Sequence, residues 1–316
     1  MIQQRVFVTG AGGFVGRNVC AGLLKAGFGV LGITRKCGSL PIGVENVVVG
    51  CIDDCTNFLD DLAGCNVVVH LAARVHVTKE TSFDPLTEFR QMNVRSTLNL
   101  ARQAAMAGIR RFVFISSIGV NGAATFQKPF AEHDPVAPHS PYAVSKHEAE
   151  LGLQALAAET GMEVVIIRPP LVYGPNAPGN FGALIRAVQR GWPLPLGAIH
   201  NKRSLIGLDN LVNFIVTCVN HPSAANQTFL ISDGQDVSTT ELVCGIAQAM
   251  GRPARLLPVP TRWLILASAM MGKPDAAQRL CGSLQVDTSK AHQLLGWTPP
   301  LSLNEGLKKV AEGLRV

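Results

Sequence analysis

The first half of the chain alternates short runs of β-branched residues with longer stretches of helical periodicity. The apolar runs are continuous rather than alternating, which is typical of strands buried on both faces of a parallel sheet. The pattern predicts strands at 5–9, 29–34, 46–50, 66–71, 111–117 and 163–168. Between them it predicts helices at 14–26, 86–107 and 141–160. This alternation predicts an α/β fold with a Rossmann-like, doubly wound parallel sheet.

The composition of the chain changes after residue 168, where Pro and Gly become frequent. This composition favours loops and short helices over a second regular sheet. Helical periodicity recurs at 181–190, 208–220, 239–250, 261–271, 288–295 and 303–314. We expect residues 1–170 to form a dinucleotide-binding domain that parts of 204–232 complete. Residues 171–316 are then mainly a smaller C-terminal substrate-binding lobe over the carboxyl edge of the sheet, where open α/β folds bind ligands.

Composition narrows the classes of partner. The 316 residues carry a formal charge of +6 and are 47% apolar, so the chain can build a sizeable core. The positive residues are scattered, which argues against nucleic acid and is compatible with a small anionic ligand. Eight cysteines form no C-x-x-C pair and show no zinc-ligand spacing, so we predict free thiols and no metal site.

The ends of the chain carry no pattern that we interpret as a targeting or membrane segment. The N-terminus looks like a strand and a turn rather than a signal peptide. The apolar run at 263–272 is too short to span a bilayer. We therefore expect a cytoplasmic protein without a membrane span.

Three glycines, Gly10, Gly13 and Gly16, lie between the first predicted strand and the first predicted helix. Glycines at this spacing let the backbone turn tightly and approach a pyrophosphate, which the N–H groups of the helix N-terminus then bind. We predict a dinucleotide-binding loop.

The end of the second predicted strand carries positive charge where an NAD-binding protein usually has a carboxylate. The sequence there is Thr34, Arg35 and Lys36, and no acidic residue occurs before Glu45. A carboxylate would bind the ribose hydroxyls and repel a 2′-phosphate, whereas a guanidinium can bind that phosphate through two hydrogen bonds. Arg35 therefore favours NADP(H), although NAD(H) is also compatible with the loop.

Tyr142 and Lys146 are four residues apart on a predicted helix and so share a face. We expect the charge of Lys146 to lower the pKa of the phenol from about 10, which suits Tyr142 as a general acid and base between a hydroxyl and a carbonyl. Ser117 follows a buried strand, at the edge where ligands bind. It is the candidate that holds the substrate oxygen beside Tyr142.

Together these motifs make the chain similar to the extended short-chain dehydrogenase/reductases, in the branch of nucleotide-sugar epimerases, dehydratases and reductases. The resemblance also includes "HLAA" at 70–73, "MNV" at 92–94, "SS" at 116–117 and "RPPLVYGP" at 168–175. The resemblance and the arguments above give these expected cofactor contacts: Gly10, Gly13, Phe14, Val15, Gly16, Arg35, Leu71, Ala72, Ala73, Asn93, Ser116, Tyr142, Lys146, Pro169 and Val172. The catalytic residues are expected to be Ser117, Tyr142 and Lys146. The resemblance implies substrate contacts by Ser117, Asn180, Arg203 and Arg279.

The residues that follow Ser117 exclude one of the reaction types found in this family. Dehydratases of this family carry an Asp-Glu pair there, whereas this chain has Ile118 and Gly119, which cannot transfer protons. With the dehydratases excluded, the resemblance implies hydride transfer at C4 of a nucleotide-diphosphate sugar. Our first hypothesis is NADPH-dependent reduction of a UDP-4-keto-6-deoxy-N-acetylhexosamine in surface polysaccharide biosynthesis, such as that of O-antigen and lipopolysaccharide, because Arg35 favours NADP(H).

Three alternatives stay open at this point. The first is a UDP-glucose or UDP-N-acetylglucosamine 4-epimerase with bound NAD. The second is a reductase of steroid-like or phenolic carbonyls, which would have little use for Arg203 in its substrate lobe. The third is a non-catalytic protein that senses NADP, which would have little reason to keep Tyr142 together with Lys146. The resemblance also implies a homodimer formed through 86–107 and 141–160.

Overall fold

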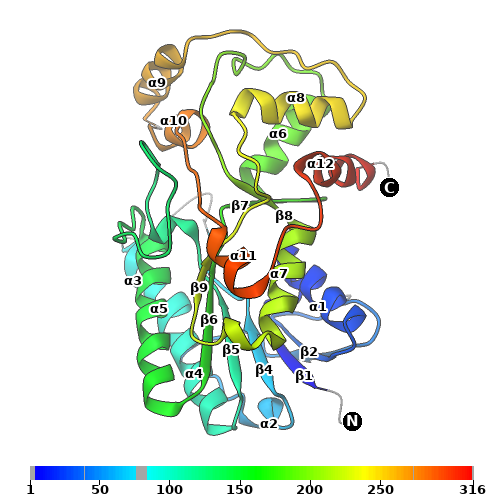
Figure 1. The fold of residues 1–316 in the computed structure, drawn as a ribbon, viewed down its shortest axis with the longest axis vertical. Coiled ribbons are helices and arrows are strands. Elements are labelled where there is room, and N and C mark those ends of the chain that lie inside the picture. The colour runs from blue at the N-terminus through cyan, green and yellow to red at the C-terminus, as the bar shows by residue number, and fades with distance from the viewer. Residues whose placement is uncertain (1–3, 39, 76–83, 273, 315–316) are drawn as a thin grey trace.

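The computed structural model of the 316-residue chain describes residues 4–38, 40–75, 84–272 and 274–314. In this described part, seven parallel strands form one sheet in the order β3-β2-β1-β4-β5-β6-β9 (Figure 1). The strands are β1 (Arg5–Thr9), β2 (Gly29–Thr34), β3 (Val44–Val48), β4 (Val67–His70), β5 (Arg111–Ile115), β6 (Glu163–Arg168) and β9 (Thr228–Leu230). The chain reverses its direction across the sheet between β1 and β4, and ligands of such folds bind outside that point. The predicted Rossmann-like fold is confirmed.

The central strands are buried on both faces, as their continuous apolar runs predict. In β1, Val6 and Val8 belong to the core under one helix layer, and Phe7 belongs to the core under the other. All three side chains are fully buried. Burial on both faces is why these strands show no alternation in the sequence.

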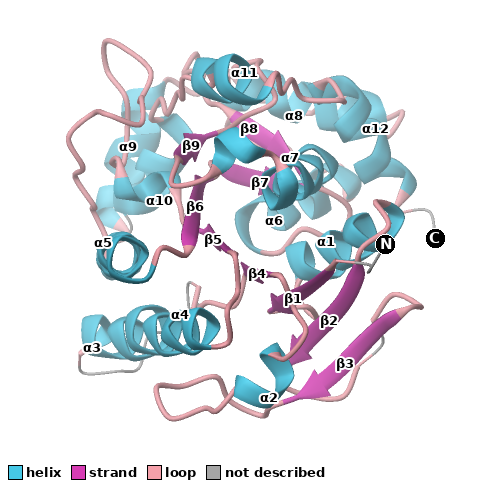
Figure 2. Ribbon diagram, turned by 60° about the horizontal axis from the view of Figure 1, so that its bottom comes forward, coloured by secondary structure: helices cyan, strands magenta, loops and turns pink. Residues whose placement is uncertain are grey.

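Helices cover both faces of the sheet (Figure 2). One layer contains α1 (Phe14–Lys25), α7 (Leu208–Asn220) and α11 (Ser289–Leu295). The other contains α2 (Leu59–Leu62), α3 (Pro85–Arg90), α4 (Ser96–Met106) and α5 (Pro141–Thr160). Short helical turns lie at Gln91–Arg95, Ile118–Val120 and Pro222–Ala224. The two helix layers do not cover the carboxyl edge of the sheet, where the C-terminal lobe lies.

The lobe gathers at one end of the molecule, above the sheet in Figure 1. It contains α6 (Gly179–Gln189), α8 (Thr239–Ala249), α9 (Thr261–Met270), α10 (Pro274–Cys281) and α12 (Leu303–Glu312). Strands β7 (Leu171–Tyr173) and β8 (Leu205–Gly207) pair in parallel where the sheet and the lobe meet. After β8 the chain returns to the sheet through α7 and β9, which pairs with β6. The domain boundaries drawn from the sequence stay predictions.

The structure differs from the predicted elements where the pattern is weak. The helix expected at 86–107 is interrupted by a π-helical turn at Gln91–Arg95, and β3 begins at 44 rather than 46. The three-residue strands β7, β8 and β9 were not predicted, because three residues are too few to show a period. The α10 helix begins at Pro274 with small and polar residues, so it gives no apolar signal either.

Candidate active site

The three glycines of the loop between β1 and α1 build a cradle that larger residues could not. Gly10 has a positive φ of 68°, and a Cβ on it would lie 2.9 Å from the Ala72 nitrogen. A Cβ on Gly16 would lie 2.1 Å from the Gly10 carbonyl oxygen. A substitution at Gly10 or Gly16 would therefore push β1, β4 and α1 apart.

The N-terminus of α1 is available to an anion. Gly13 is its N-cap and provides no side-chain hydrogen bond, and the first turn holds no acidic residue. The N–H groups of Phe14, Val15 and Gly16 have no acceptor inside the helix, as in any helix of this kind. Together with the positive end of the helix dipole they fit the pyrophosphate of a dinucleotide.

The end of β2 presents the charges that the sequence predicts. Thr34 is buried and its hydroxyl donates to Asn46 Oδ1 at 2.9 Å. Arg35 and Lys36, which follow, are exposed. They are therefore accessible to a ligand at the edge where Gly12 approaches Thr34.

The end of β4 lies directly beside the glycine cradle, because Ala72 is the closest neighbour of Gly10. Leu71, Ala72 and Ala73 are half-buried, and the Ala72 N–H donates to Thr9 Oγ1 at 3.2 Å. The backbone of this segment therefore forms a wall of the cradle.

His70 is a buried residue under the cradle that sequence reasoning did not assign a role. Its Nδ1 lies 2.8 Å from Thr9 Oγ1 and its Nε2 lies 3.0 Å from Thr97 Oγ1. Burial, and then the charge of Lys146, lowers its pKa to about 3. The imidazole is therefore neutral at physiological pH and links β1, β4 and α4 through hydrogen bonds.

Asn93 lies in the π-helical turn and ties two parts of the site together. Its side chain accepts from the Arg74 N–H at 2.8 Å and donates to the Arg74 carbonyl oxygen at 3.1 Å. It also donates to Ser145 Oγ at 3.0 Å, on α5 between Tyr142 and Lys146. The loop after β4 is thus bound to α5, the helix of Tyr142 and Lys146, and the anchoring role that the resemblance implies has a geometric basis.

The α5 helix presents Tyr142 one turn before Lys146. Ser140 caps the helix by accepting from the Ala143 N–H at 3.2 Å, and Pro141 occupies its first position. Gly161 ends it with a φ of 76°. These local signals fix the register that turns Tyr142 and Lys146 to the same face.

The expected effect of Lys146 on the phenol is wrong for this structure. Burial raises the pKa of Tyr142 to about 12. Burial also lowers the pKa of Lys146 to about 7, against the opposing effect of the Glu150 carboxylate. Desolvation is therefore the cause of the shift at Tyr142 and the larger cause at Lys146. The Lys146 ammonium donates to the Ile115 carbonyl oxygen at 2.7 Å and lies 4.3 Å from the centre of the Phe114 ring.

Ser117 is half-buried at the end of β5, where it caps the short 3₁₀ turn Ile118–Val120 by accepting from the Gly119 N–H at 3.1 Å. The hydroxyl of the preceding Ser116 points elsewhere and donates to Glu150. The Ser116 N–H donates to the Ile167 carbonyl oxygen at 2.7 Å. The two donors of Ser116 are thus engaged within the protein, and its oxygen atoms are left to accept in the cofactor contact that we predicted.

Glu150 and Arg168 form an ion pair beside the predicted catalytic residues, and this pair was not predicted from the sequence. Both side chains are buried, and Arg168 donates to the two carboxylate oxygens at 3.0 and 2.5 Å. Its Nη1 donates to Asn121 Oδ1 at 2.9 Å. With the bond from Ser116, the pair holds both flanks of the turn that contains Ser117. The spacing in the sequence could have pointed to Glu150, because it lies one turn after Lys146 on the same face of α5.

The residues expected to bind substrate are distributed over the lobe. Arg203 is half-buried and donates from Nη1 to the Gly282 carbonyl oxygen at 3.1 Å, immediately after α10. Burial lowers its pKa. Arg279 is exposed on α10, and Asn180 is exposed on α6. The structure therefore connects Arg203 to the segment that follows Arg279, whereas Asn180 stays a separate surface residue.

Pro169 and Val172 lie where β6 passes into β7. The Pro169 carbonyl oxygen accepts from the Ile118 N–H at 3.0 Å, so this segment contacts the turn after Ser117. Val172 is half-buried and pairs with Ile206 of β8. Both lie at the carboxyl edge, as the predicted contact with the nicotinamide requires.

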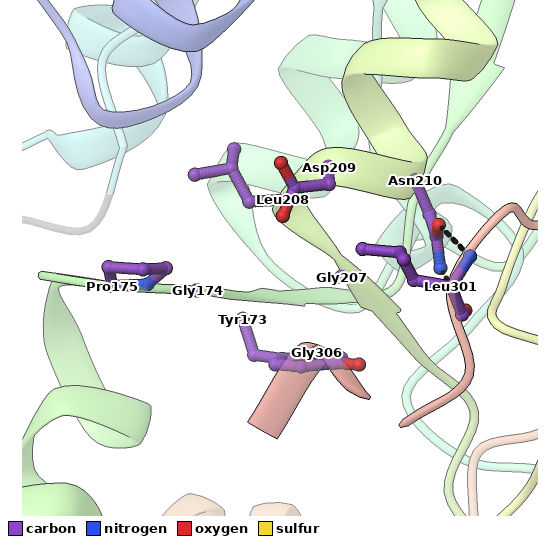
Figure 3. A pocket seen from close by; sticks show the side chains of 9 residues that line it. All are labelled: Tyr173, Gly174, Pro175, Gly207, Leu208, Asp209, Asn210, Leu301 and Gly306. Atoms are coloured by element: carbon purple, nitrogen blue, oxygen red, sulfur yellow. Dashed lines mark hydrogen bonds between the residues drawn. The ribbon is translucent and has the colours of Figure 1, made fainter. Parts of the chain in front are cut away.

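A small cavity lies beside this edge, and none of the predicted catalytic residues lines it (Figure 3). Its lining includes Tyr173, Asn210 and Leu301, and its volume of about 10 Å³ is near the minimum for one water molecule. The Tyr173 hydroxyl donates to the buried Asp233 at 2.6 Å, and Asn210 donates to the same carboxylate at 2.7 Å. This network fixes β7, β8 and α7 and offers no room for a sugar.

Asp53, Asp54 and Cys55 bring potential metal-ligand atoms within 4.8 Å of one another, although we predicted no metal site. The Asp53 carboxylate already accepts from Thr56 Oγ1 and from the Cys55 N–H. These bonds belong to an ordinary turn, and they lower the pKa of Asp53.

Comparison with known proteins places this geometry in context. The model of the NAD dependent epimerase/dehydratase family matches residues 6–232. A UDP-glucose 4-epimerase of Vibrio cholerae is 47% identical over 314 residues, which cover 98% of this chain and 95% of that protein. A solved structure of MoeE5 with UDP-glucose and NAD is 28% identical, covers 98% of both chains and has a TM-score of 0.79. The UDP-glucose 4-epimerase of Thermotoga maritima, solved with UDP-glucose, shares the fold with a TM-score of 0.80 at 23% identity over 99% of both chains.

Proposed function

Since the chain belongs to the NAD dependent epimerase/dehydratase family, we propose that it is a UDP-hexose 4-epimerase that works with bound NAD. The observation that carries this proposal is the 47% identity to the Vibrio cholerae UDP-glucose 4-epimerase across nearly the whole of both chains. This likeness supports the epimerase alternative better than our first hypothesis of ketosugar reduction. The substrate is then UDP-glucose or UDP-N-acetylglucosamine, and the reaction inverts C4.

The residues of the cradle fit the cofactor. The positive φ of Gly10, the contact of Gly16 with Gly10 and the uncapped end of α1 leave room and N–H donors for a pyrophosphate. Leu71 to Ala73 would border the adenosine side, and Pro169 and Val172 the nicotinamide side. When bound, NAD supplies the redox chemistry by accepting a hydride from C4 and returning it.

The proton transfers fall to Tyr142. Its phenol oxygen takes the proton of the C4 hydroxyl in the oxidative half and returns it to the C4 oxygen in the reductive half. A phenol with a raised pKa suits the second step without help. The first step needs the phenolate, which burial disfavours, and the ammonium of Lys146, one turn away, is the charge that can offset part of that cost. Ser117 holds the C4 oxygen in place.

One observation favours a second candidate, the NADPH-dependent 4-ketosugar reductase. Arg35 is exposed at the end of β2, and the loop holds no carboxylate that would repel a 2′-phosphate. Selection of NADP(H) would connect the enzyme to reductive biosynthesis, for which a surface polysaccharide precursor is the expected product. The preference for NADP(H) is therefore part of this candidate and not of the first. Under either candidate we keep the homodimer through α3–α5 and the cytoplasmic location as predictions.

The experiment that decides between the two uses the same purified protein in two assays. Epimerase activity converts UDP-glucose into UDP-galactose to an equilibrium mixture, followed by proton NMR, without net change in nicotinamide absorbance. Reductase activity consumes NADPH only when a UDP-4-ketosugar is added. Activity in neither assay would contradict both candidates.

A variant pair tests the cofactor loop. If Arg35 binds a 2′-phosphate, Arg35→Ser weakens NADPH binding by roughly 10- to 100-fold and leaves NADH binding unchanged, as expected for the loss of a charged hydrogen bond. Lys36→Ser is the matched control on the neighbouring exposed residue. Equal binding of both nucleotides by the parent protein would remove Arg35 from cofactor selection.

A further inference from the structure

The outer face of α9 is apolar, opposite to what a surface helix normally shows. Trp263, Leu266 and Met270 are 56%, 52% and 82% exposed. They follow one another at intervals of three and four residues and so form a single ridge along the helix. The opposite face carries Ser268, which is buried, and Leu264, which is half-buried. We call Trp263, Leu266 and Met270 the α9 ridge.

Arg and Lys outnumber Asp and Glu in the segments that lead to the α9 ridge, and the first acidic residue after it is Asp275 in α10. No Asp or Glu occurs in 169–208 or in 242–272, and these two segments together hold seven Arg and Lys residues. Arg262 is exposed beside the ridge, and Arg255 is exposed on the segment that pairs with the chain around Leu194. Trp192 and Leu257 are also exposed, on the two segments that pair at Leu194 and Leu256, and the Arg190 guanidinium lies 5.1 Å from the centre of the Trp192 ring.

We propose that the α9 ridge, with Arg255 and Arg262, docks the enzyme on the surface of a membrane rich in anionic lipids. A short helix with Trp and aliphatic residues on one face and Arg beside it is the composition of helices that lie in the interface of a bilayer. Anionic headgroups supply the charges that the two segments lack. A second copy of this chain fits the surface less well, because symmetric self-contact would bring Arg255 and Arg262 of both copies together, and neither of the two segments supplies an acidic residue.

The geometry suits docking rather than insertion. Among the described residues no helix has the length and apolar content needed to cross a bilayer. The ten residues of α9 span about 15 Å, which is enough for shallow contact along the surface. In Figure 1, α9 lies at the outer end of the lobe, far from the sheet. Docking there would leave the glycine cradle and α5 facing the aqueous phase.

The test is flotation of the full chain with lipid vesicles. Vesicles of phosphatidylcholine alone are compared with vesicles that contain 30% phosphatidylglycerol, at low salt and at 0.5 M salt. We expect flotation with the anionic vesicles at low salt and its loss at high salt, because the attraction is screened. The double variant Leu266→Ser/Met270→Ser should reduce the bound fraction at least about tenfold, since it removes two large apolar contacts.

The control is Met106→Ser, which replaces a methionine that is 75% exposed at the end of α4. It should float like the parent protein, and thermal unfolding verifies that each variant is folded, whatever the catalytic activity. Equal flotation of the double variant and the parent would overturn the proposal, as would no flotation of the parent with anionic vesicles. A change from dimer to monomer in the double variant, without vesicle binding by the parent, would assign the α9 ridge to a contact between copies instead.

Discussion

Two helices of this molecule invert the usual distribution of polar and apolar residues, and they do so in opposite directions. The α5 helix buries Lys146 and Glu150, which are 2% and 1% exposed. The α9 helix leaves Trp263 and Met270 in contact with water. Charged residues are rarely buried to this degree, and large apolar residues rarely gather on the outside of a helix.

The difference lies in what surrounds each helix. Every buried charge of α5 has partners inside the protein: the Ile115 carbonyl and the Phe114 ring for Lys146, and Arg168 and Ser116 for Glu150. The exposed residues of α9 face outward from the lobe. We interpret the buried charges of α5 as part of the chemistry, and the exposed apolar ridge beside Arg262 as a surface that binds another molecule. The following experiments test this distinction, beginning with the largest effect.

The largest effect is expected at Tyr142, the only residue of α5 that we assign to proton transfer. Tyr142→Phe should lower kcat by about 10²- to 10⁴-fold, because that is the usual contribution of a positioned acid or base. The nucleotide and the sugar should bind with affinities close to those of the parent, measured by calorimetry, because the aromatic ring is kept.

The other tyrosine of the sequence provides a matched control. Tyr173→Phe removes a hydroxyl that donates to buried Asp233, so it should destabilise the fold by about 1 to 3 kcal/mol and leave most of kcat. If Tyr142→Phe kept normal turnover, the hydroxyl of Tyr142 would have no part in the reaction, and the assignment of chemistry to α5 would fail.

The ion pair behind Ser117 should show its importance in stability and then in turnover. Glu150→Gln leaves Arg168 buried without a full countercharge, so the free energy of unfolding should fall by about 3 to 5 kcal/mol. Since the pair also holds the turn with Ser117, kcat should fall further than KM rises. Denaturant unfolding and steady-state kinetics measure the two effects.

Glu150→Asp distinguishes charge from geometry at this position. It restores the charge with a shorter side chain, so it should recover stability more than turnover. Equal recovery of both would mean that Glu150 acts on the fold alone and does not position Ser117.

Much of this architecture could be predicted from the sequence, because the signals are local. The limits of α1 and α5 follow from a glycine turn, a Ser-Pro cap and Gly161 at the end of a periodic run. The cradle and the face shared by Tyr142 and Lys146 follow from spacing alone. These features depend on neighbours along the chain, and the structure confirms their geometry.

What could not be predicted depends on burial and on distant partners. The pKa of Tyr142 rises instead of falling, because desolvation is set by the surrounding fold and not by a residue one turn away. The pairing of Glu150 with Arg168 joins residues on two elements, and the link from His70 to Thr97 joins two others. The exposure of the α9 ridge was equally invisible, since the same apolar pattern would describe a helix packed inward.

A third experiment concerns His70, a buried titratable group whose ring nitrogens bond to two threonine hydroxyls and not to a countercharge. His70 has a folded pKa of about 3, below its unfolded value of 6.5, so the unfolded state binds more protons between these values. Stability is therefore fully present above about pH 6.5 and is lost as the pH falls. Between pH 6.5 and 5 we expect a loss of about 1.5 kcal/mol from this group.

The variant His70→Gln isolates that contribution, because it keeps hydrogen-bonding groups and removes the titration. The free energy of unfolding of this variant should change less over the same interval, measured by urea denaturation at each pH. Lys146 titrates near pH 7 and above in this structure and so stays protonated over most of the interval. Parallel curves for the parent and the variant would show that His70 does not set the acid sensitivity.

The smallest effect on the free energy of unfolding is expected for a substitution on α9. If the α9 ridge is a docking surface, its residues should contribute little to the stability of the fold. Met270→Ser should change the free energy of unfolding by less than about 0.5 kcal/mol, because an exposed side chain loses few contacts when it is shortened. A helix whose apolar residues stabilised the lobe would instead lose 2 kcal/mol or more, as buried methionines do. Urea denaturation of Met270→Ser beside Leu242→Ala, a buried residue of α8, compares the two cases directly. A large loss for Met270→Ser would mean that the ridge packs against the protein in solution, and α9 would then be an ordinary core helix rather than a docking surface.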